Sequence, residues 1–494
     1  MKRILLSLSF LAAGLILNSC SGLHSAGCTT GCTTGNANLS VTLLDTPPSG
    51  VNFLSFNLPI IGITLTSATT NNPVNVFSPT TIPSFDLVRL QSDSSLLGTF
   101  QVPADSYNKM TITLGTPSTI FANTSSSTIS SCPASAVCTF NGGTVGSVDI
   151  PLSPALQLGS NANVGLGLDF NLNNIATTSG TGGISFDFTQ TNAITTVSLP
   201  RIGQASGTLD SIEDFTGVVT TLNGSTLTIT SKSRGTLTGT VSSSTTYTGL
   251  LSVNDVCGGS AASQSCLGTG KTVSVDANIS TSGLVNITEV DFIDDPSVDE
   301  IEGTIYPTTT AGKYGMIVSD VVNASGNTVL STVGSGFSLF FTLDPSATFA
   351  VDTRNLGAAI AGGFGSASDL VAGQQVMIHV KSINSSSTTN VVTDRLVLRY
   401  TRTSAVVSIA GGGNQFSITA PAFFGLLGTP QVQTFTGITV FDGVSDVTGI
   451  ATNDNVSIRA LYLNPQVAAP ALLAAKVRDN GASAAAVAAA RKKH

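Results

Sequence analysis

The chain has 494 residues, of which 41% are apolar, only 10% are charged and 6% are aromatic, and it contains no tryptophan. This length predicts several domains, and the few charged residues together with 50 glycines argue against long surface helices and favour strands. The formal net charge of −8 argues against a nucleic-acid partner, because phosphate binding needs a basic surface.

Residues 1–19 have the pattern of a secretory signal peptide. Two basic residues precede an apolar run, Ile4–Leu17, which is too short to remain as a membrane-spanning helix. The run ends in Leu17-Asn18-Ser19-Cys20, which resembles the bacterial lipobox, in which the cysteine becomes the lipidated first residue of the mature protein. The resemblance implies export and lipid anchoring through Cys20, and Ser21 implies the outer membrane, on its periplasmic or surface face. The alternative is an ordinary cleaved signal in which Cys20 is incidental.

The six cysteines after Cys20 fall into three close pairs. They are Cys28 with Cys32, Cys132 with Cys138, and Cys257 with Cys266. An even number in an exported chain predicts disulfides, and local pairing is favoured because short loops close at small entropic cost. A zinc site at the first pair is the competing interpretation, but His24 brings its ligands only to three, short of a tetrahedral set. Residues 20–37 are otherwise expected to be a flexible tether.

Residues 38–200 are predicted to form an antiparallel β-sandwich. Apolar and polar residues alternate in Leu39–Leu43 and Val164–Phe170, so each segment has one apolar face, and a dense turn signal follows at Asp45–Gly50. Residues 115–146 are rich in Ser, Thr and Gly, contain the second cysteine pair, and are expected to be a long surface loop. Short strands separated by turns are typical of a sandwich.

A degenerate repeat follows, with units at residues 201–298, 299–402 and 403–478. Its clearest element is a strand with alternating apolar residues: Lys271–Ala277, Gln375–Val380 and Asn455–Ala460. The first unit also contains Asn223-Gly224, a two-residue hairpin signal. Each unit is predicted to close into a small β-barrel, because closure hides strand edges. Residues 479–494 are expected to be a loose tail.

The two regions resemble two families of unknown function found together in exported bacterial lipoproteins. In the first domain the resemblance is carried by Leu39–Asp45, Pro47, Phe85–Leu90, Leu97-Gly98 and Val102–Met110; the repeats that resemble the barrel family start at Gly207, Gly303 and about Ser404. The resemblance implies an all-β architecture with a sandwich followed by barrels. Neither family has a catalytic signature that could be transferred to this chain.

The motifs that could carry chemistry are few. Gly268–Thr272 has the end of a phosphate-binding loop, but an alternating strand follows where that motif needs a helix. His379 is the only histidine inside a predicted domain, and we expect it on the solvent-facing side of a strand.

The densest charge lies between the first two repeats. It comprises Asp291, Asp294, Asp295, Asp299, Glu300 and Glu302. The first four are candidate calcium ligands, since calcium takes six to eight oxygen ligands. The favoured interpretation is a solvated linker kept open by repulsion between like charges. No other cofactor is predicted.

These features predict a lipid-anchored envelope protein with a non-catalytic binding or structural role. The expected partners are the membrane, reached through the lipid, and a polysaccharide, an envelope protein or other matrix. One alternative is a calcium-dependent adhesion module. Another is a carbohydrate-active enzyme, which would need facing carboxylates, for example among Asp86, Asp93 and Asp105.

Overall fold

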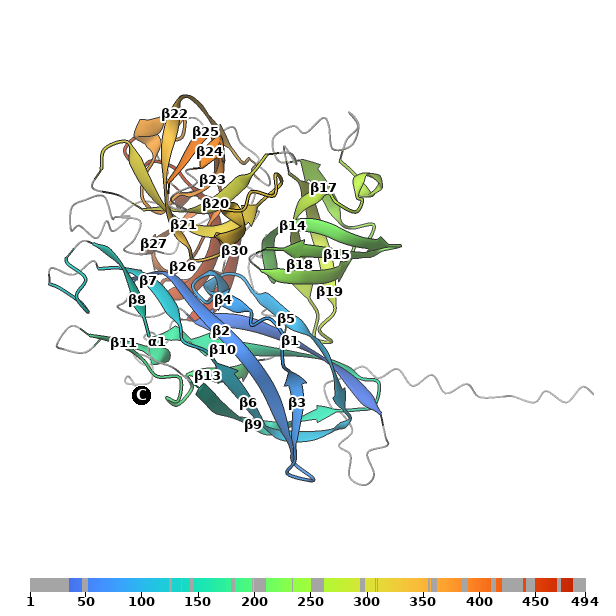
Figure 1. Cartoon of the computed structure of the whole chain (residues 1–494). Coiled ribbons are helices and arrows are strands. Elements are labelled where there is room, and N and C mark those ends of the chain that lie inside the picture. Colours follow the sequence, from blue (N-terminus) through green and yellow to red (C-terminus); the bar gives the residue numbers. More distant parts are fainter. Residues whose placement is uncertain are drawn as a thin grey trace, which may run out of the picture.

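The structure is a computed structural model that describes residues 35–482. Within this range it leaves out 47–51, 124–126, 135, 143–145, 179–182, 198, 200–209, 233, 250–261, 294–297, 307, 309, 354–355, 357–361, 384–389, 410–414, 420–438, 441–448 and 469–471. The described part is almost entirely β-structure, which confirms the predicted all-β class (Figure 1). Among the described helices, none is long and apolar enough to cross a membrane.

The N-terminal domain is a sandwich of two sheets. One has the order β13-β10-β1-β5, from β1 (Asn36–Thr46), β5 (Ser95–Pro103), β10 (Asn163–Asn171) and β13 (Ile194–Val197). The other has the order β8-β7-β2-β6-β9, from β2 (Asn52–Ser67), β6 (Asp105–Leu114), β7 (Ser118–Ala122), β8 (Val137–Asn141) and β9 (Gly146–Leu158), with β3 (Pro73–Phe77) and β4 (Ser84–Asp86) also paired to β2. All these pairings are antiparallel except that of β1 with β10, which is parallel.

Short elements complete the sandwich. They are the 3-10 helix η1 (Arg89–Gln91), helix α1 (Leu172–Ile175) and the paired strands β11 (Ala176–Thr178) and β12 (Ile184–Phe186). The core contains the apolar residues of β1 that were predicted from alternation, Leu39, Val41 and Leu43. The other face of β1 is also covered: Leu44 belongs to the core of the next domain, and the backbone at Gly283 lies against Ser40.

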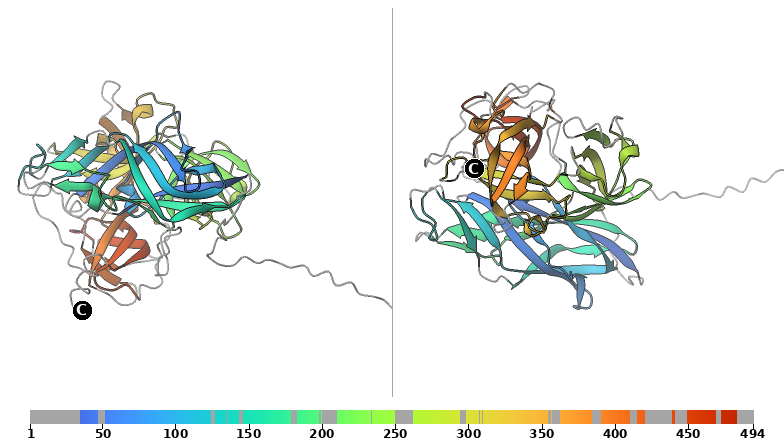
Figure 2. Two further views of the ribbon diagram at one scale, coloured as in Figure 1. Left: turned by 90° about the horizontal axis from the view of Figure 1, so that it is seen from below. Right: turned by 45° about the horizontal axis from the view of Figure 1, so that its top comes forward.

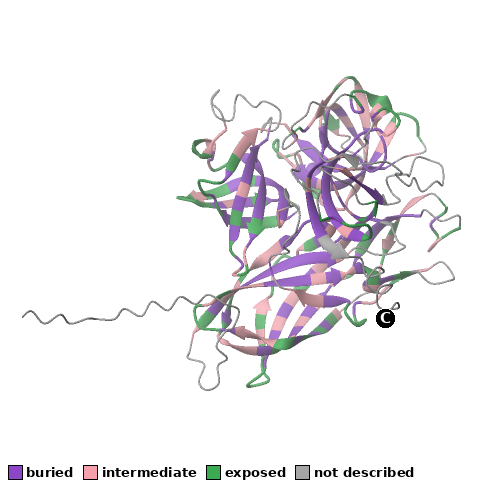
Figure 3. Ribbon diagram, turned by 180° about the vertical axis from the view of Figure 1, so that it is seen from behind, coloured by how far each residue is buried: buried purple, intermediate pink, exposed green. Residues whose placement is uncertain are grey.

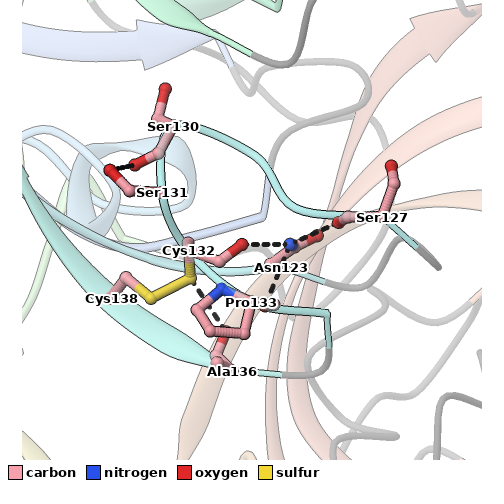
Figure 4. The surroundings of a disulfide bond; sticks show 8 residues. All are labelled: Asn123, Ser127, Ser130, Ser131, Cys132, Pro133, Ala136 and Cys138. Atoms are coloured by element: carbon pink, nitrogen blue, oxygen red, sulfur yellow. Dashed lines mark hydrogen bonds between the residues drawn. A yellow bond between two sulfur atoms is a disulfide. The ribbon is translucent and has the colours of Figure 1, made fainter.

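Residues 115–146 are not simply a loop, because β7 and β8 pair within them. Cys132 and Cys138 form a disulfide beside this hairpin, as the local pairing predicted, with their Cα atoms 5.8 Å apart (Figure 4). The side-chain amide of Asn123 donates to the carbonyls of Ser127, Cys132 and Pro133 and fixes the turn. Cys266 is also disulfide-bonded. The predicted pairs Cys28 with Cys32 and Cys257 with Cys266 each include cysteines that lie outside the described residues.

Three small barrels follow the sandwich. Barrel 1 contains β14 (Ile212–Asn223), β15 (Thr226–Ser231), β16 (Gly235–Thr240), β17 (Thr246–Gly249), β18 (Thr272–Ile279) and β19 (Val285–Phe292). Barrel 2 contains β20 (Glu300–Tyr306), β21 (Lys313–Val322), β22 (Ser338–Val351), β23 (Gln375–His379), β24 (Ser382–Ile383) and β25 (Asn390–Arg399). Barrel 3 contains β26 (Thr401–Ile409), β27 (Gln415–Thr419), β28 (Thr439–Val440), β29 (Asp454–Tyr462) and β30 (Leu472–Ala482). The 3-10 helices η2 (Gln264–Cys266), η3 (Leu330–Thr332) and η4 (Ala367–Asp369) lie in their loops.

The three barrels share one topology. Their ring orders are β14-β15-β16-β19-β18, β20-β21-β22-β25-β23 and β26-β27-β28-β30-β29. Numbered along the chain within each ring, the order is 1-2-3-5-4, and strands 3 and 5 are parallel in every barrel. This is the strand order of the OB-fold, a small Greek-key barrel. The predicted repeat strands lie in β18, β23 and β29, which are all strand 4, so the periodic signal in the sequence marks one structural position.

The sandwich and the barrels are packed against one another. Barrels 1 and 2 lie over the same side of the sandwich, and barrel 3 emerges beside them (Figures 1 and 2). Buried residues run along the barrel strands, including the strands nearest the centre of the molecule (Figure 3). The four domains meet at the centre of the molecule, where many of the buried side chains are charged.

Candidate functional site

Charged side chains from all four domains meet in the interior of the protein. We call this cluster the charged junction, and it consists of Arg89, Asp93, Asp210, Glu213, Asp214, Arg234, Asp276, Glu302, Asp352, Arg399, Arg402, Arg459 and Lys476. Most of their ion pairs cross domain boundaries, and most of these side chains are less than a tenth exposed. Buried charges are costly unless they are paired and hydrogen-bonded. We infer that these ion pairs fix the positions of the four domains relative to one another.

Asp214 is the centre of the charged junction. Its Oδ1 accepts a hydrogen bond from Arg459 Nη2 at 2.8 Å, and its Oδ2 accepts one from Arg402 Nη2 at 2.6 Å. The residue lies at a bulge of β14 with a φ of 44°, a left-handed conformation that aspartate tolerates better than most residues. Its amide donates to Oδ1 of Asp276 at 2.7 Å, which holds the bulge. This backbone turn presents one carboxylate of barrel 1 to two arginines of barrel 3.

The repeat strands supply opposite charges at one equivalent position. Asp276 on β18, His379 on β23 and Arg459 on β29 each lie three residues after the first valine of the repeat pattern. The position faces away from the core of its own barrel, yet all three residues are buried. Asp276 and Arg459 are buried against each other's barrel, whereas His379 pairs with Glu300 of its own barrel. Asp276 Oδ2 lies 3.2 Å from Arg459 Nη1. Barrels 1 and 3 thus pack through the same face, acidic in one and basic in the other.

Lys476 on β30 completes this contact from the strand beside Arg459. Its Nζ lies 2.9 Å from Asp210, 2.8 Å from Asp276 and 3.5 Å from Glu213. Carboxylate oxygens of these three acids lie within 4.8 Å of one another, an arrangement that could hold a metal ion. Here the ammonium of Lys476 supplies the positive charge.

The acids around Lys476 have opposite pKa shifts. Burial and the neighbouring Asp276 raise the pKa of Glu213 well above its ordinary value. Burial also acts to raise the pKa of Asp276, but Lys476 and Arg459 outweigh it and hold that pKa at about 2. Burial alone would lower the pKa of Lys476, but Asp276 and Glu213 hold it well above its ordinary value. At neutral pH Asp276 is therefore a stable carboxylate partner for Lys476 and Arg459, whereas the charged form of Glu213 is disfavoured.

Barrel 2 contributes a second branch of the junction. Arg399 Nη1 lies 2.8 Å from Asp352, and its Nε lies 3.5 Å from Glu302. Glu302 also accepts a hydrogen bond from the side-chain amide of Gln375 at 2.9 Å. The guanidinium of Arg459 stacks over the ring of Tyr400 at 4.5 Å, which links barrels 2 and 3.

The sandwich reaches the junction through η1 and the residues after it. Asp93 Oδ2 pairs with Arg234 Nη2 of barrel 1 at 2.7 Å. The carbonyl of Gln91 accepts hydrogen bonds from two serines of barrel 3, Ser404 at 3.0 Å and Ser457 at 3.4 Å. This short helical turn thus joins the sandwich to two barrels.

Several residues singled out from the sequence have different surroundings from those expected. His379 is buried rather than solvent-facing, with Nε2 3.2 Å from Oε1 of Glu300. The solvated-linker interpretation is wrong for the described acids of the run, since Asp291, Asp299, Glu300 and Glu302 are all buried. For the phosphate-loop-like segment Gly268–Thr272 the prediction is confirmed: strand β18, and not a helix, follows Gly270.

The predicted calcium ligands do not form one described cluster. Asp291 lies on β19 and accepts a hydrogen bond from Thr248, while Asp299 accepts hydrogen bonds from the amide and hydroxyl of Ser325, at 2.8 and 2.6 Å. Asp294 and Asp295 lie outside the described residues.

The carboxylates considered for an enzyme also have separate surroundings. Asp86 accepts the amides of Phe56 and Val88 at 2.8 and 3.2 Å, and Asp105 accepts the hydroxyls of Ser67 and Thr69. Asp93 belongs to the charged junction.

Comparison with known proteins gives no relative: no protein-family model matches the chain, and no curated protein does.

Proposed function

We propose that this is a lipid-anchored cell-envelope protein with a non-catalytic binding role, and that it contacts polysaccharide through a threonine-rich sheet face. The observation that carries the proposal is the separation of side chains in barrel 1. Its acidic groups Glu213, Asp214 and Asp276 point into the charged junction, while hydroxyls cover a face on the other side of the ring. We call this surface the threonine face, and it consists of Thr226, Thr228, Thr230, Thr236, Thr238 and Thr240.

The threonine face is regular. Strands β15 and β16 pair Thr226 with Thr240, Thr228 with Thr238, and Thr230 with Thr236. The hydroxyls of the last two pairs lie 3.1 and 3.3 Å apart, and the side chains are exposed or partly exposed.

Two general arguments connect this surface with carbohydrate. Threonine hydroxyls both donate and accept hydrogen bonds, as sugar hydroxyls do. Strands 2 and 3 of a barrel with the OB order also form the face that commonly binds oligosaccharides or oligonucleotides. The net charge of −8 favours the uncharged ligand.

Removing two central hydroxyls tests the binding face. The double variant Thr228→Ala and Thr238→Ala is expected to bind its glycan about tenfold more weakly on a glycan array, since each neutral hydrogen bond contributes about 0.5–1.5 kcal/mol. Thr113→Ala is the matched control, because Thr113 forms a similar cross-strand hydroxyl pair with Ser147, but on the sandwich. Equal binding by the double variant and the wild type, or no glycan bound by either, would contradict the proposal.

The anchoring is tested at the N-terminus of the mature protein. Mass spectrometry of protein from a lipoprotein-processing bacterium is expected to find a chain that begins at an acylated Cys20 and sediments with membranes. Cys20→Ser is expected to leave the membrane fraction, because each buried methylene of the lipid contributes roughly 0.8 kcal/mol to anchoring. Cys132→Ser, which removes a different cysteine, should remain membrane-bound. Detection of Met1 or of an unmodified Cys20 in the mature wild type would show that anchoring fails.

A further inference from the structure

A cavity of about 90 Å³ lies beside the charged junction, between the sandwich and barrels 2 and 3. One water needs roughly 10–15 Å³ of such volume, so the cavity has room for a group of several non-hydrogen atoms. Its walls include Phe53 and Ile317, and its charged lining residues are Arg89, Arg402 and Asp86. It is therefore a partly apolar space bordered by two guanidinium groups.

Each of the two arginines has a donor group that makes no hydrogen bond. The Nε atoms of both Arg89 and Arg402 are buried and have no hydrogen-bond partner. A buried donor without an acceptor is destabilising, and more so when it is charged. One Nη atom of Arg402 donates to Asp214. Arg89 donates to the carbonyls of Ser319 and Asp214, both at 3.5 Å, and its Nε lies 3.7 Å from Oδ2 of Asp93, beyond hydrogen-bond distance.

The nearby acids do not balance Arg89. Its nearest acid, Asp93, is 3.7 Å away and is bound more closely by Arg234, at 2.7 Å. Burial and the positive charges of Arg234 and Arg402 lower the pKa of Arg89 to about 10, against the opposing effect of Asp93 and Asp320. The surroundings therefore stabilise the Arg89 cation less than water does, and an added negative charge would be attracted to it.

Asp86 is the acid among the residues that line the cavity, and burial disfavours its charged form while Arg89 favours it. Its Oδ1 accepts the amides of Phe56 and Val88, and burial raises its pKa. Because its position is fixed by β4 and its carboxyl oxygen already serves these amides, it leaves the cavity with an excess of donors.

We propose that this cavity binds a small oxyanion, a carboxylate or an inorganic phosphate or sulfate, between Arg89 and Arg402. Guanidinium groups present several N–H donors that match the oxygens of such anions. The apolar walls strengthen the attraction by keeping water away. The bound anion would join η1 of the sandwich to barrel 3 and so add to the charged junction.

The test is a calorimetric titration of the full chain with sodium phosphate and, separately, with sodium acetate, at constant ionic strength. We expect saturable binding of one anion per chain with a Kd of about 1 mM or tighter for at least one of them, and the stronger of the two distinguishes an inorganic oxyanion from a carboxylate. No saturation by either anion at about 50 mM, far above that Kd, would overturn the proposal.

Variants locate the site. Arg89→Gln removes the charge but keeps a polar amide, and it is expected to weaken binding at least tenfold, as the loss of a charge-assisted hydrogen bond predicts. Lys109→Gln removes the same charge from an exposed pair with Asp149 on the sandwich and should bind as the wild type does. Val88→Met fills the cavity without a change of charge and should also abolish binding. Unchanged affinity in Arg89→Gln or in Val88→Met would show that the anion binds elsewhere.

Discussion

Replacement of Asp214 by alanine is expected to lower the free energy of unfolding by about 3–5 kcal/mol, the cost of removing one partner from a buried ion pair. In the wild type the Asp214 carboxylate accepts hydrogen bonds from Arg402 and Arg459. The substitution removes this carboxylate and leaves both arginines buried without it. It also puts alanine at a φ of 44°, where aspartate is better tolerated. Denaturant unfolding of the wild type and the variant measures the difference.

The control for Asp214 is an exposed ion pair on the sandwich. Asp149 pairs with Lys109 at 3.0 Å, and both side chains are well exposed. Asp149→Ala should therefore cost no more than about 1 kcal/mol. If Asp214→Ala proved as mild as Asp149→Ala, the charged junction would not hold the domains together.

The second large effect is a contrast between two neighbouring acids. Asp276→Asn is expected to cost about 3–5 kcal/mol at neutral pH, because it removes a buried carboxylate that pairs with Lys476 at 2.8 Å and with Arg459 at 3.2 Å. Glu213→Gln should stay within about 1 kcal/mol of the wild type or exceed it, since the charged form of Glu213 is disfavoured by burial and by Asp276. Both acids lie near the same lysine, so distance alone does not predict this difference.

The pH dependence follows from the two shifts. The folded-state pKa of Asp276, about 2, is below its unfolded value near 3.9, so its stabilisation is present above about pH 4 and is lost as the pH falls towards 2. The pKa of Glu213 is raised instead, so its contribution is full below about pH 4.3 and is lost as the pH rises through its folded pKa. Melting temperatures from pH 3 to 8 should show less acid sensitivity in Asp276→Asn and less alkaline loss in Glu213→Gln. Parallel profiles for the two variants would contradict the assigned shifts.

The all-β class and the repeat strands could be predicted because they depend on local periodicity. In each of β18, β23 and β29, alternate residues point into the core of the barrel to which that strand belongs. The two-residue alternation is therefore visible within one short segment of sequence. The order of the strands in the sheets and barrels could not be predicted in this way, since it depends on which distant strands pair. The parallel pairing of β1 with β10 is an example, because it joins segments more than a hundred residues apart.

The charged junction escaped prediction for a related reason. Asp276 and Arg459 stand where alternation places a solvent-facing residue, and the contact between barrels 1 and 3 brings them together in the interior. A signal was nevertheless present, because an ionisable side chain recurs at the same place in all three repeat strands of a chain that is only 10% charged. Asp214 carried no such signal, since its role depends on a backbone bulge.

Differential scanning calorimetry of the wild type and Asp214→Ala measures most directly whether buried ion pairs join the sandwich and barrels into one body. The wild type should unfold in one cooperative transition, with equal calorimetric and van't Hoff enthalpies, and the variant should separate into transitions of individual domains. Independent domain transitions in the wild type, unaffected by the loss of Asp214, would be the contradicting result.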